Sequence, residues 1–109
     1  MTTARFSTTG GCIRAVEISG HAGYAEAGED IVCAAISSAL DLTSCFLDDI
    51  LGLTLQTEVD EENGRIRLVL PTKMEENAAE QAQNAMSALM VYLINLGVRY
   101  PDFIEVMEV

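Results

Sequence analysis

The segment from Asp30 to Ile50 limits the possible folds more than any other part of the chain. Its apolar residues recur every three or four positions over a wide arc of a helix. They are Ile31, Val32, Ala35, Ile36, Ala39, Leu42, Phe46, Leu47 and Ile50. A helix this apolar is stable in water only when a sheet or a second helix covers it. The segment therefore predicts a central helix in a layered domain.

A second helix is predicted to begin after Thr72. Thr72 and Glu75 have the spacing of a capping box, in which hydroxyl and carboxylate each accept a hydrogen bond from a free amide of the first turn. Gly97, followed by Pro101, is predicted to end this helix. The apolar residues between these signals recur at helical spacing and predict a face packed in the core: Ala82, Met86, Leu89, Leu93 and Leu96.

Five short segments have the composition of strands: 2–8, 12–19, 53–59, 65–70 and 103–109. Gly10-Gly11 suits a hairpin turn between the first two, and Asn63-Gly64 separates the third from the fourth. The pattern favours the α+β class, with two main helices on an antiparallel or mixed β-sheet and the element order ββαββαβ. We expect a single domain over residues 1–109, since this length supports a core without disulfides.

Composition also restricts the cellular context. The first eleven residues lack the apolar stretch of a signal peptide, and we expect no membrane span and no membrane partner. Three cysteines are an odd number, which favours free thiols in a reducing cytoplasm. A net charge of −11 argues against direct binding of nucleic acid. This acidity either keeps the protein soluble or attracts a basic partner, and the charge count alone favours the first interpretation.

Cys33 differs from the other two cysteines by its position on the first helix. A narrow polar stripe runs along that helix, and Cys33 lies at its margin, one turn before Ser37; the stripe consists of Asp30, Ser37, Asp41, Ser44 and Asp48. With Asp30 as N-cap, Cys33 falls in the first turn, where unpaired amides and the helix dipole favour a thiolate. The carboxylates of Glu26, Glu29 and Asp30 oppose that effect.

His21, the single histidine, is the candidate base for this thiol. The alternative interpretation needs no site: His21 is an ordinary surface histidine, and Cys33 is a small hydrophobic residue. Asp30 as a plain cap and Ser37 as a small contact residue are similar alternatives. A metal site is disfavoured, because His21, Cys33 and one carboxylate lack the paired spacing of zinc ligands. No cofactor is expected.

The segment Gly20-His21-Ala22, then Gly28, Asp30-Ile31-Val32-Cys33-Ala34-Ala35 and Ser37, resembles the signature of the ribosomal-processing cysteine protease family, Prp. The likeness extends over the whole chain, including the ending Tyr100-Pro101-Asp102-Phe103-Ile104.

The resemblance implies a cysteine endopeptidase with Cys33 as nucleophile and His21 as general base. Asp30, Ser37, Gly20, Ala22 and Gly28 match further motif positions and are candidate supporting or substrate-binding residues. It also implies a homodimer. The implied substrate is a basic bacterial large-subunit ribosomal protein, whose N-terminal extension is cut after a short hydrophobic, aromatic-containing motif. We expect amides at the helix start to receive the oxyanion, and residues 22–29 to order around bound peptide.

Two other functions are compatible with the sequence. A non-enzymatic ribosome-associated adaptor would need the fold and the acidity but no reactive thiol. A thiol redox protein would need Cys12 or Cys45 to approach Cys33.

Overall fold

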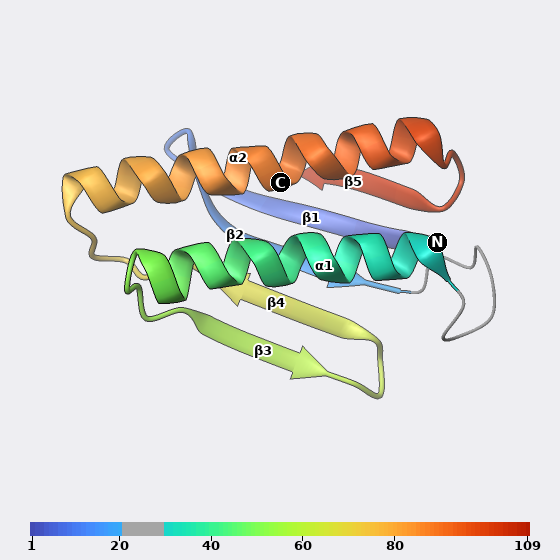
Figure 1. The fold of residues 1–109 in the computed structure, drawn as a ribbon, viewed down its shortest axis with the longest axis horizontal. Helices are drawn as coiled ribbons and strands as arrows, with labels where there is room; N and C mark the ends of the chain where they lie inside the picture. Colours follow the sequence, from blue (N-terminus) through green and yellow to red (C-terminus); the bar gives the residue numbers. More distant parts are fainter. Residues whose placement is uncertain (21–29) are drawn as a thin grey trace.

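The computed structural model describes residues 1–20 and 30–109. Figure 1 shows two long helices side by side on one face of a sheet. This is an α+β fold with the predicted order ββαββαβ. The elements are β1 (Thr2–Thr9), β2 (Cys12–Ser19), α1 (Ile31–Cys45) with a closing π-helical turn η1 (Phe46–Ile50), β3 (Gln56–Asp60), β4 (Arg65–Val69), α2 (Glu76–Arg99) and β5 (Ile104–Glu108).

The sheet is mixed, with the strand order β3-β4-β2-β1-β5. Neighbouring strands run antiparallel except β1 and β5, which are parallel. Along β1, Ala4 and Phe6 are buried beneath the helices, whereas Arg5 faces the open side of the sheet, opposite Glu17 of β2. This alternation places a polar face on one side and the core on the other.

Only part of the apolar arc of α1 is buried. The residues on the sheet side form one stripe: Val32, Ile36, Leu40, Thr43 and Leu47. Ile31, Leu42 and Ile50 are 52%, 72% and 70% exposed. The predicted packing of this helix on sheet and neighbouring helix is thus confirmed, but part of its apolar arc stays exposed, because the sheet covers α1 from one side and α2 covers only part of another.

The combined helix Ile31–Ile50 is long and apolar enough, by length and composition, to cross a membrane. The same test is passed by core helices of soluble domains, and Val32, Ile36 and Leu47 of this helix are packed in the core.

The bounds of α2 differ from the prediction at both ends. The helix begins at Glu76, and Glu75 in the N-cap position makes no side-chain capping bond, so the predicted capping box with Thr72 does not form. Residues 72–75 instead connect the sheet layer to the helix layer, and Glu75 has an extended backbone. At the other end the helix continues through Gly97, where an added Cβ would lie 3.4 Å from Ile104 Cγ2. Gly97 therefore permits close packing of α2 on β5.

The third strand is shorter than predicted. It pairs with β4 only from Gln56, which lies opposite Val69 at the end of β4. Leu53 and Leu55 precede the strand and pack against the core without joining the ladder. Because Leu53 and Leu55 are apolar, the sequence pattern predicted a strand that begins at residue 53 instead of 56.

Candidate functional site

Asp30 caps α1 and thereby fixes the position of Cys33. Its side chain is buried, 6% exposed, and Oδ1 accepts hydrogen bonds from the amides of Val32 at 3.0 Å and Cys33 at 2.9 Å. Cys33 is the third helical residue and is half-buried. Both the N-cap and the first-turn position of the cysteine are as predicted.

Replacing Asp30 by alanine should lower the free energy of unfolding by about 1 kcal/mol, the usual value of an N-cap. Urea denaturation measures this change. Asp30→Asn should retain most of the stability, because an amide oxygen can still accept both bonds. The matched control is Asp41→Ala, which removes an exposed carboxylate from the same helix. Equal losses for Asp30→Ala and Asp41→Ala would contradict the capping role. We also expect Asp30→Ala to reduce peptide cleavage less than replacement of Cys33 does.

A cavity of about 240 Å³ lies beside Cys33. Three segments meet there: the first turns of α1, the end of β2 with the start of β1, and the hairpin of β3 and β4. The residues that line it are Thr2, Ile18, Gly20, Cys33, Ile36, Ser37, Val59, Asp60, Glu61, Gly64, Arg65 and Ile66. Cys33 and Ser37, one helical turn apart, thus face a common space, as the polar stripe predicted.

Gly20 closes the end of β2 at this cavity. Its φ is +83°, and a Cβ at this position would lie 2.6 Å from the carbonyl oxygen of Met1. Its amide donates to the carbonyl oxygen of Gly64 at 3.1 Å. Only glycine fits this combination of left-handed backbone and close approach. Gly20 therefore sets the direction in which the chain leaves β2.

The structure brings together some of the predicted site residues. Cys33, Ser37 and Gly20 line the cavity, and Asp30 supports it through the helix cap. His21, Ala22 and Gly28 lie outside the described residues, as does the segment 22–29 that was predicted to order around peptide. Within the described ranges, no group of three or more His, Cys, Asp or Glu side chains could hold a metal ion.

The predicted oxyanion donors at the start of α1 are already paired. The amides of Val32 and Cys33 donate to Asp30 Oδ1, and the amide of Ala34 donates to the carbonyl oxygen of Asp30 at 3.0 Å. The expectation that these amides point outward as free donors was wrong. The reason is that the acidic N-cap occupies the positions that an oxyanion would need.

The other cysteines are remote from Cys33. Cys45 follows twelve residues later on the same helix, about 18 Å away at 1.5 Å per residue. Cys12 begins β2, whose opposite end faces the cavity. None of the three cysteines forms a disulfide, which needs Cα atoms within about 7 Å. The geometry contradicts a redox site with Cys45 or Cys12 as resolving cysteine.

Thr2, Asp60 and Glu61 also line the cavity, although no sequence motif predicted them there. The acidic run Asp60-Glu61-Glu62 was visible, but only the pairing of β4 with β2 brings the β3–β4 turn beside Cys33. Thr2 reaches the cavity because β1 is the other neighbour of β2. The first contact depends on pairing between distant segments, whereas the second follows from the hairpin of β1 and β2.

The model of the cysteine protease Prp family matches residues 1–105. The chain belongs to the Prp family. It is 26% identical over 94 residues to the ribosomal processing cysteine protease Prp of Bacillus subtilis (strain 168), covering 86% of this chain and 84% of that protein. The family is one of peptidases, and the chain is therefore a cysteine protease rather than a non-enzymatic adaptor.

Solved structures show the same fold. The essential ribosomal processing protease Prp from S. aureus, in complex with a covalently linked product peptide, superposes with a TM-score of 0.88 at 22% identity, each chain being covered completely. A protein of Streptococcus mutans superposes with a TM-score of 0.82 at 29% identity, over 99% of this chain and 93% of that one. The Prp fold is thus present over the full length of this chain.

Proposed function

We propose that this Prp protein removes the N-terminal extension of a bacterial large-subunit ribosomal protein, number twenty-seven in the bacterial scheme, with Cys33 as nucleophile and His21 as general base. One observation carries the assignment of the nucleophile. Cys33 lies in the first turn of α1 and lines a cavity, whereas Cys12 and Cys45 do not line it. Family membership supports the reaction class, and the S. aureus complex with a linked product peptide supports a peptide as the substrate.

The reaction proceeds through an acyl-enzyme. His21 takes the proton of Cys33, and Sγ attacks the scissile carbonyl carbon. The C–N bond breaks as His21 returns the proton to the leaving amine. Water then attacks the thioester, giving one proton through His21 to the Cys33 sulfur as the acid product leaves. The carboxylate of Asp30, bonded to the Cys33 amide, disfavours a lone thiolate nearby, so the imidazolium is an essential counter-charge.

The substrate assignment is tested with the host's own ribosomal protein. We expect incubation with the purified enzyme to remove its first residues after a hydrophobic, aromatic-containing motif, as read by intact-mass spectrometry. Enzyme with Cys33→Ala is the control. A ribosomal protein that stays intact under conditions in which the enzyme cleaves other peptides would exclude this substrate. We place the reaction in the cytoplasm, where free thiols persist and ribosomes assemble.

The second part of the proposal is that the protein is a homodimer. A groove between α1 and α2 is lined without any charged residue, by Ala35, Ser38, Ala39, Leu42, Thr43, Phe46, Ala85, Ala88, Leu89 and Tyr92. Two copies that each carry a charge of −11 repel one another over most of their surface. An uncharged apolar groove is the surface on which that repulsion is weakest and the hydrophobic gain is largest.

Light scattering coupled to size exclusion should therefore give the mass of a dimer at micromolar concentration. Leu42→Glu introduces a charge into the groove and should therefore raise the dissociation constant of the dimer at least about tenfold. Ile50→Glu is the matched control, because Ile50 is equally exposed on the same helix but does not line the groove. A monomeric wild type, or equal effects of the two variants, would contradict this interface.

A further inference from the structure

The strand β3 forms one edge of the sheet and reaches the cavity beside Cys33. Among the strands that the structure describes, β4 alone pairs with it. Figure 1 shows β3 at the bottom of the sheet, where neither helix lies over it, and all its residues except the last, Asp60, are exposed. Val59, near the end of this strand, also lines the cavity. The edge of the sheet therefore leads into the candidate site.

The hydrogen-bond pattern of the sheet determines which backbone groups of β3 point outward. The amide of Gly20 donates to the carbonyl oxygen of Gly64 at 3.1 Å, so the even-numbered residues of β4 that follow also bond to β2. The odd-numbered residues of β4 consequently bond to β3, and their partners in the register are even-numbered residues of β3. The amides and carbonyls of Thr57 and Val59 therefore point away from the sheet.

These outward groups have no hydrogen-bond partner within residues 1–20 and 30–109. Each residue carries one donor and one acceptor, so Thr57 and Val59 together present two donors and two acceptors along the edge. An extended peptide can satisfy such a row by adding a strand to the sheet. The edge of β3 thus has the backbone groups that peptide binding by strand addition needs.

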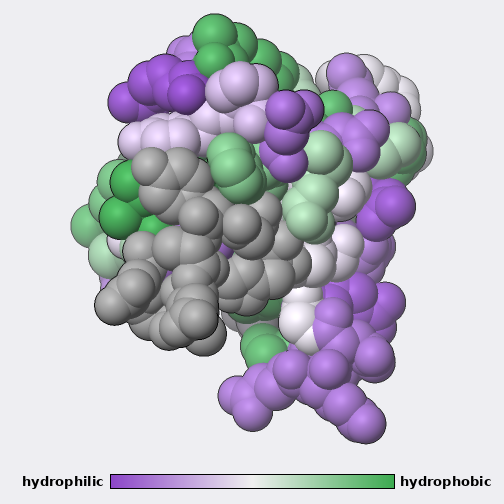
Figure 2. Space-filling view, turned by 90° about the vertical axis from the view of Figure 1, so that its right-hand side faces the viewer, coloured by the Kyte–Doolittle hydropathy of each residue, from purple (hydrophilic) through white to green (hydrophobic). Residues whose placement is uncertain are grey.

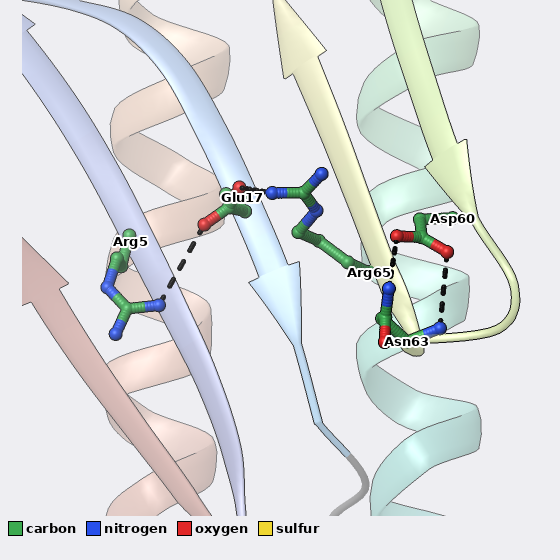
Figure 3. A network of polar contacts seen from close by, with 5 residues as sticks. All are labelled: Arg5, Glu17, Asp60, Asn63 and Arg65. Atoms are coloured by element: carbon green, nitrogen blue, oxygen red, sulfur yellow. Dashed lines mark hydrogen bonds and ion pairs between the residues drawn. The ribbon is translucent and has the colours of Figure 1, made fainter.

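The side chains of β3 show which way an added strand would present its own. Figure 3 shows Arg65 on the open face of the sheet, where its Nη1 lies 3.5 Å from Glu17 Oε1, and its register partner Asp60 lies on that face too. Side chains alternate along a strand, so Val59 points to the helix side, where it lines the cavity with Cys33. Every second side chain of an added strand would therefore face the side on which the cavity lies.

The opposite edge of the sheet is protected against strand addition. It is formed by β5, against which α2 packs. Glu108 of β5 is the register partner of the buried Phe6, so its charge points to the helix side. Charged residues that point inward at an edge discourage the pairing of a further strand. On β3 the helix-side residues are Thr57 and Val59, which are uncharged, and the strand contains no proline.

We propose that the peptide substrate adds to the free edge of β3 as a short extra strand, bonded to the main chain of Thr57 and Val59, and continues into the cavity beside Cys33. Main-chain bonds hold the peptide, and the side chain that enters the cavity supplies selectivity. Figure 2 looks onto the end of the molecule where edge and cavity meet, and the hydrophilic β3–β4 turn projects at its bottom. The proposal rests on the proposed function, peptide hydrolysis at Cys33, and identifies the strand that binds the peptide.

Binding to a Cys33→Ala enzyme tests the added strand without relying on cleavage. The probe is a fluorescein-labelled decapeptide with a Leu-Phe pair in an alanine and serine background, and each of its amides is N-methylated in turn. Methylation removes a donor and blocks close approach at residues that bond to the edge. On one side of the Leu-Phe pair, fluorescence anisotropy should show binding weakened at least about fivefold at two positions, and less than about twofold at the single residue between them. Strand pairing predicts this period of two.

Two proline variants locate the effect on the protein. Thr57→Pro removes an outward amide and none of the bonds to β4, so it should weaken binding of the unmethylated peptide at least about fivefold. Glu108→Pro is the matched control. The amide of Val109 donates to Phe6, so that of Glu108 points outward on the β5 edge, and its loss should leave binding unchanged. Circular dichroism checks that both variants are folded.

The proposal is overturned if methylation weakens binding without alternation, if it is tolerated at every position, or if the peptide does not bind. Equal binding by Thr57→Pro and Glu108→Pro also overturns it. If Thr57→Pro does not fold, the methylation series decides alone, since it leaves the protein unchanged.

The same peptides separate this inference from the proposed function. An alternating pattern of binding, without cleavage by wild-type enzyme, would contradict the catalytic assignment and leave the added strand in place. Cleavage of peptides whose binding shows no alternation would do the reverse.

Discussion

Replacing Cys33 by alanine is expected to abolish cleavage of a peptide that spans the extension junction, with a loss of about 10³-fold or more in kcat/KM. In the proposed mechanism the sulfur of Cys33 forms the acyl-enzyme, and no other cysteine lines the cavity. His21→Ala should produce a loss of similar size, since without a base the thiol keeps its proton. Circular dichroism and light scattering should show that the fold and the dimer are unchanged in both variants.

Cys45→Ser is the matched control for this prediction. Cys45 is exposed on the same helix, and its thiol donates a hydrogen bond to Asp49 Oδ2 at 3.4 Å. That bond, with the neighbouring carboxylate charges, raises the pKa of Cys45 above the ordinary thiol value. Cys45 therefore stays protonated at neutral pH, and its replacement should be nearly neutral for cleavage. If Cys33→Ala cleaved the peptide at the wild-type rate in a protease-free preparation, the assignment of Cys33 as nucleophile would be refuted.

The local features of this fold were predictable from the sequence. Asp30 caps a helix because its side chain reaches amides two and three residues ahead, and this depends on neighbours alone. In the segment 65–70, Ile66, Leu68 and Leu70 alternate with Arg65 and Arg67, a local pattern that predicts one inward face. Leu68 and Leu70 are buried on that face, and Ile66 is partly buried against the core. At Thr72 a local signal failed, since residues 72–75 connect the sheet layer to the helix layer instead of capping the helix.

The composition of the candidate site was only partly predictable. The position of Cys33 followed from helical spacing, but the place of Asp60 and Glu61 beside it results from the pairing of β4 with β2. Pairing between strands that lie 40 or more positions apart is governed by the packing of the whole sheet, which no local pattern encodes. The solvent exposure of Leu42 was likewise not predictable from the sequence, because it depends on how far α2 covers α1.

Gly20→Ala is expected to reduce kcat/KM by about 100-fold, more than its cost in stability would explain. Gly20 immediately precedes His21, and its φ of +83° sets the direction of the chain there. A methyl group would lie 2.6 Å from the Met1 carbonyl oxygen, so the backbone of Met1 or of Gly20 must shift. A shift of Gly20 would move the next residue, the proposed base His21, whereas a shift of Met1 would disturb Thr2 on the cavity wall.

The control for this last prediction is Gly10→Ala. Gly10 has a φ of +60° in the turn between β1 and β2, and an added Cβ there meets nothing within 4 Å. Both substitutions force alanine into the left-handed region, at a cost of roughly 1–2 kcal/mol in the free energy of unfolding. Only Gly20→Ala adds the steric conflict beside the site. Urea unfolding and peptide cleavage, measured on both variants, should therefore show a loss of stability for both, larger for Gly20→Ala, and a large loss of activity for Gly20→Ala alone. Equal activities would mean that the direction of the chain at Gly20 does not position the base.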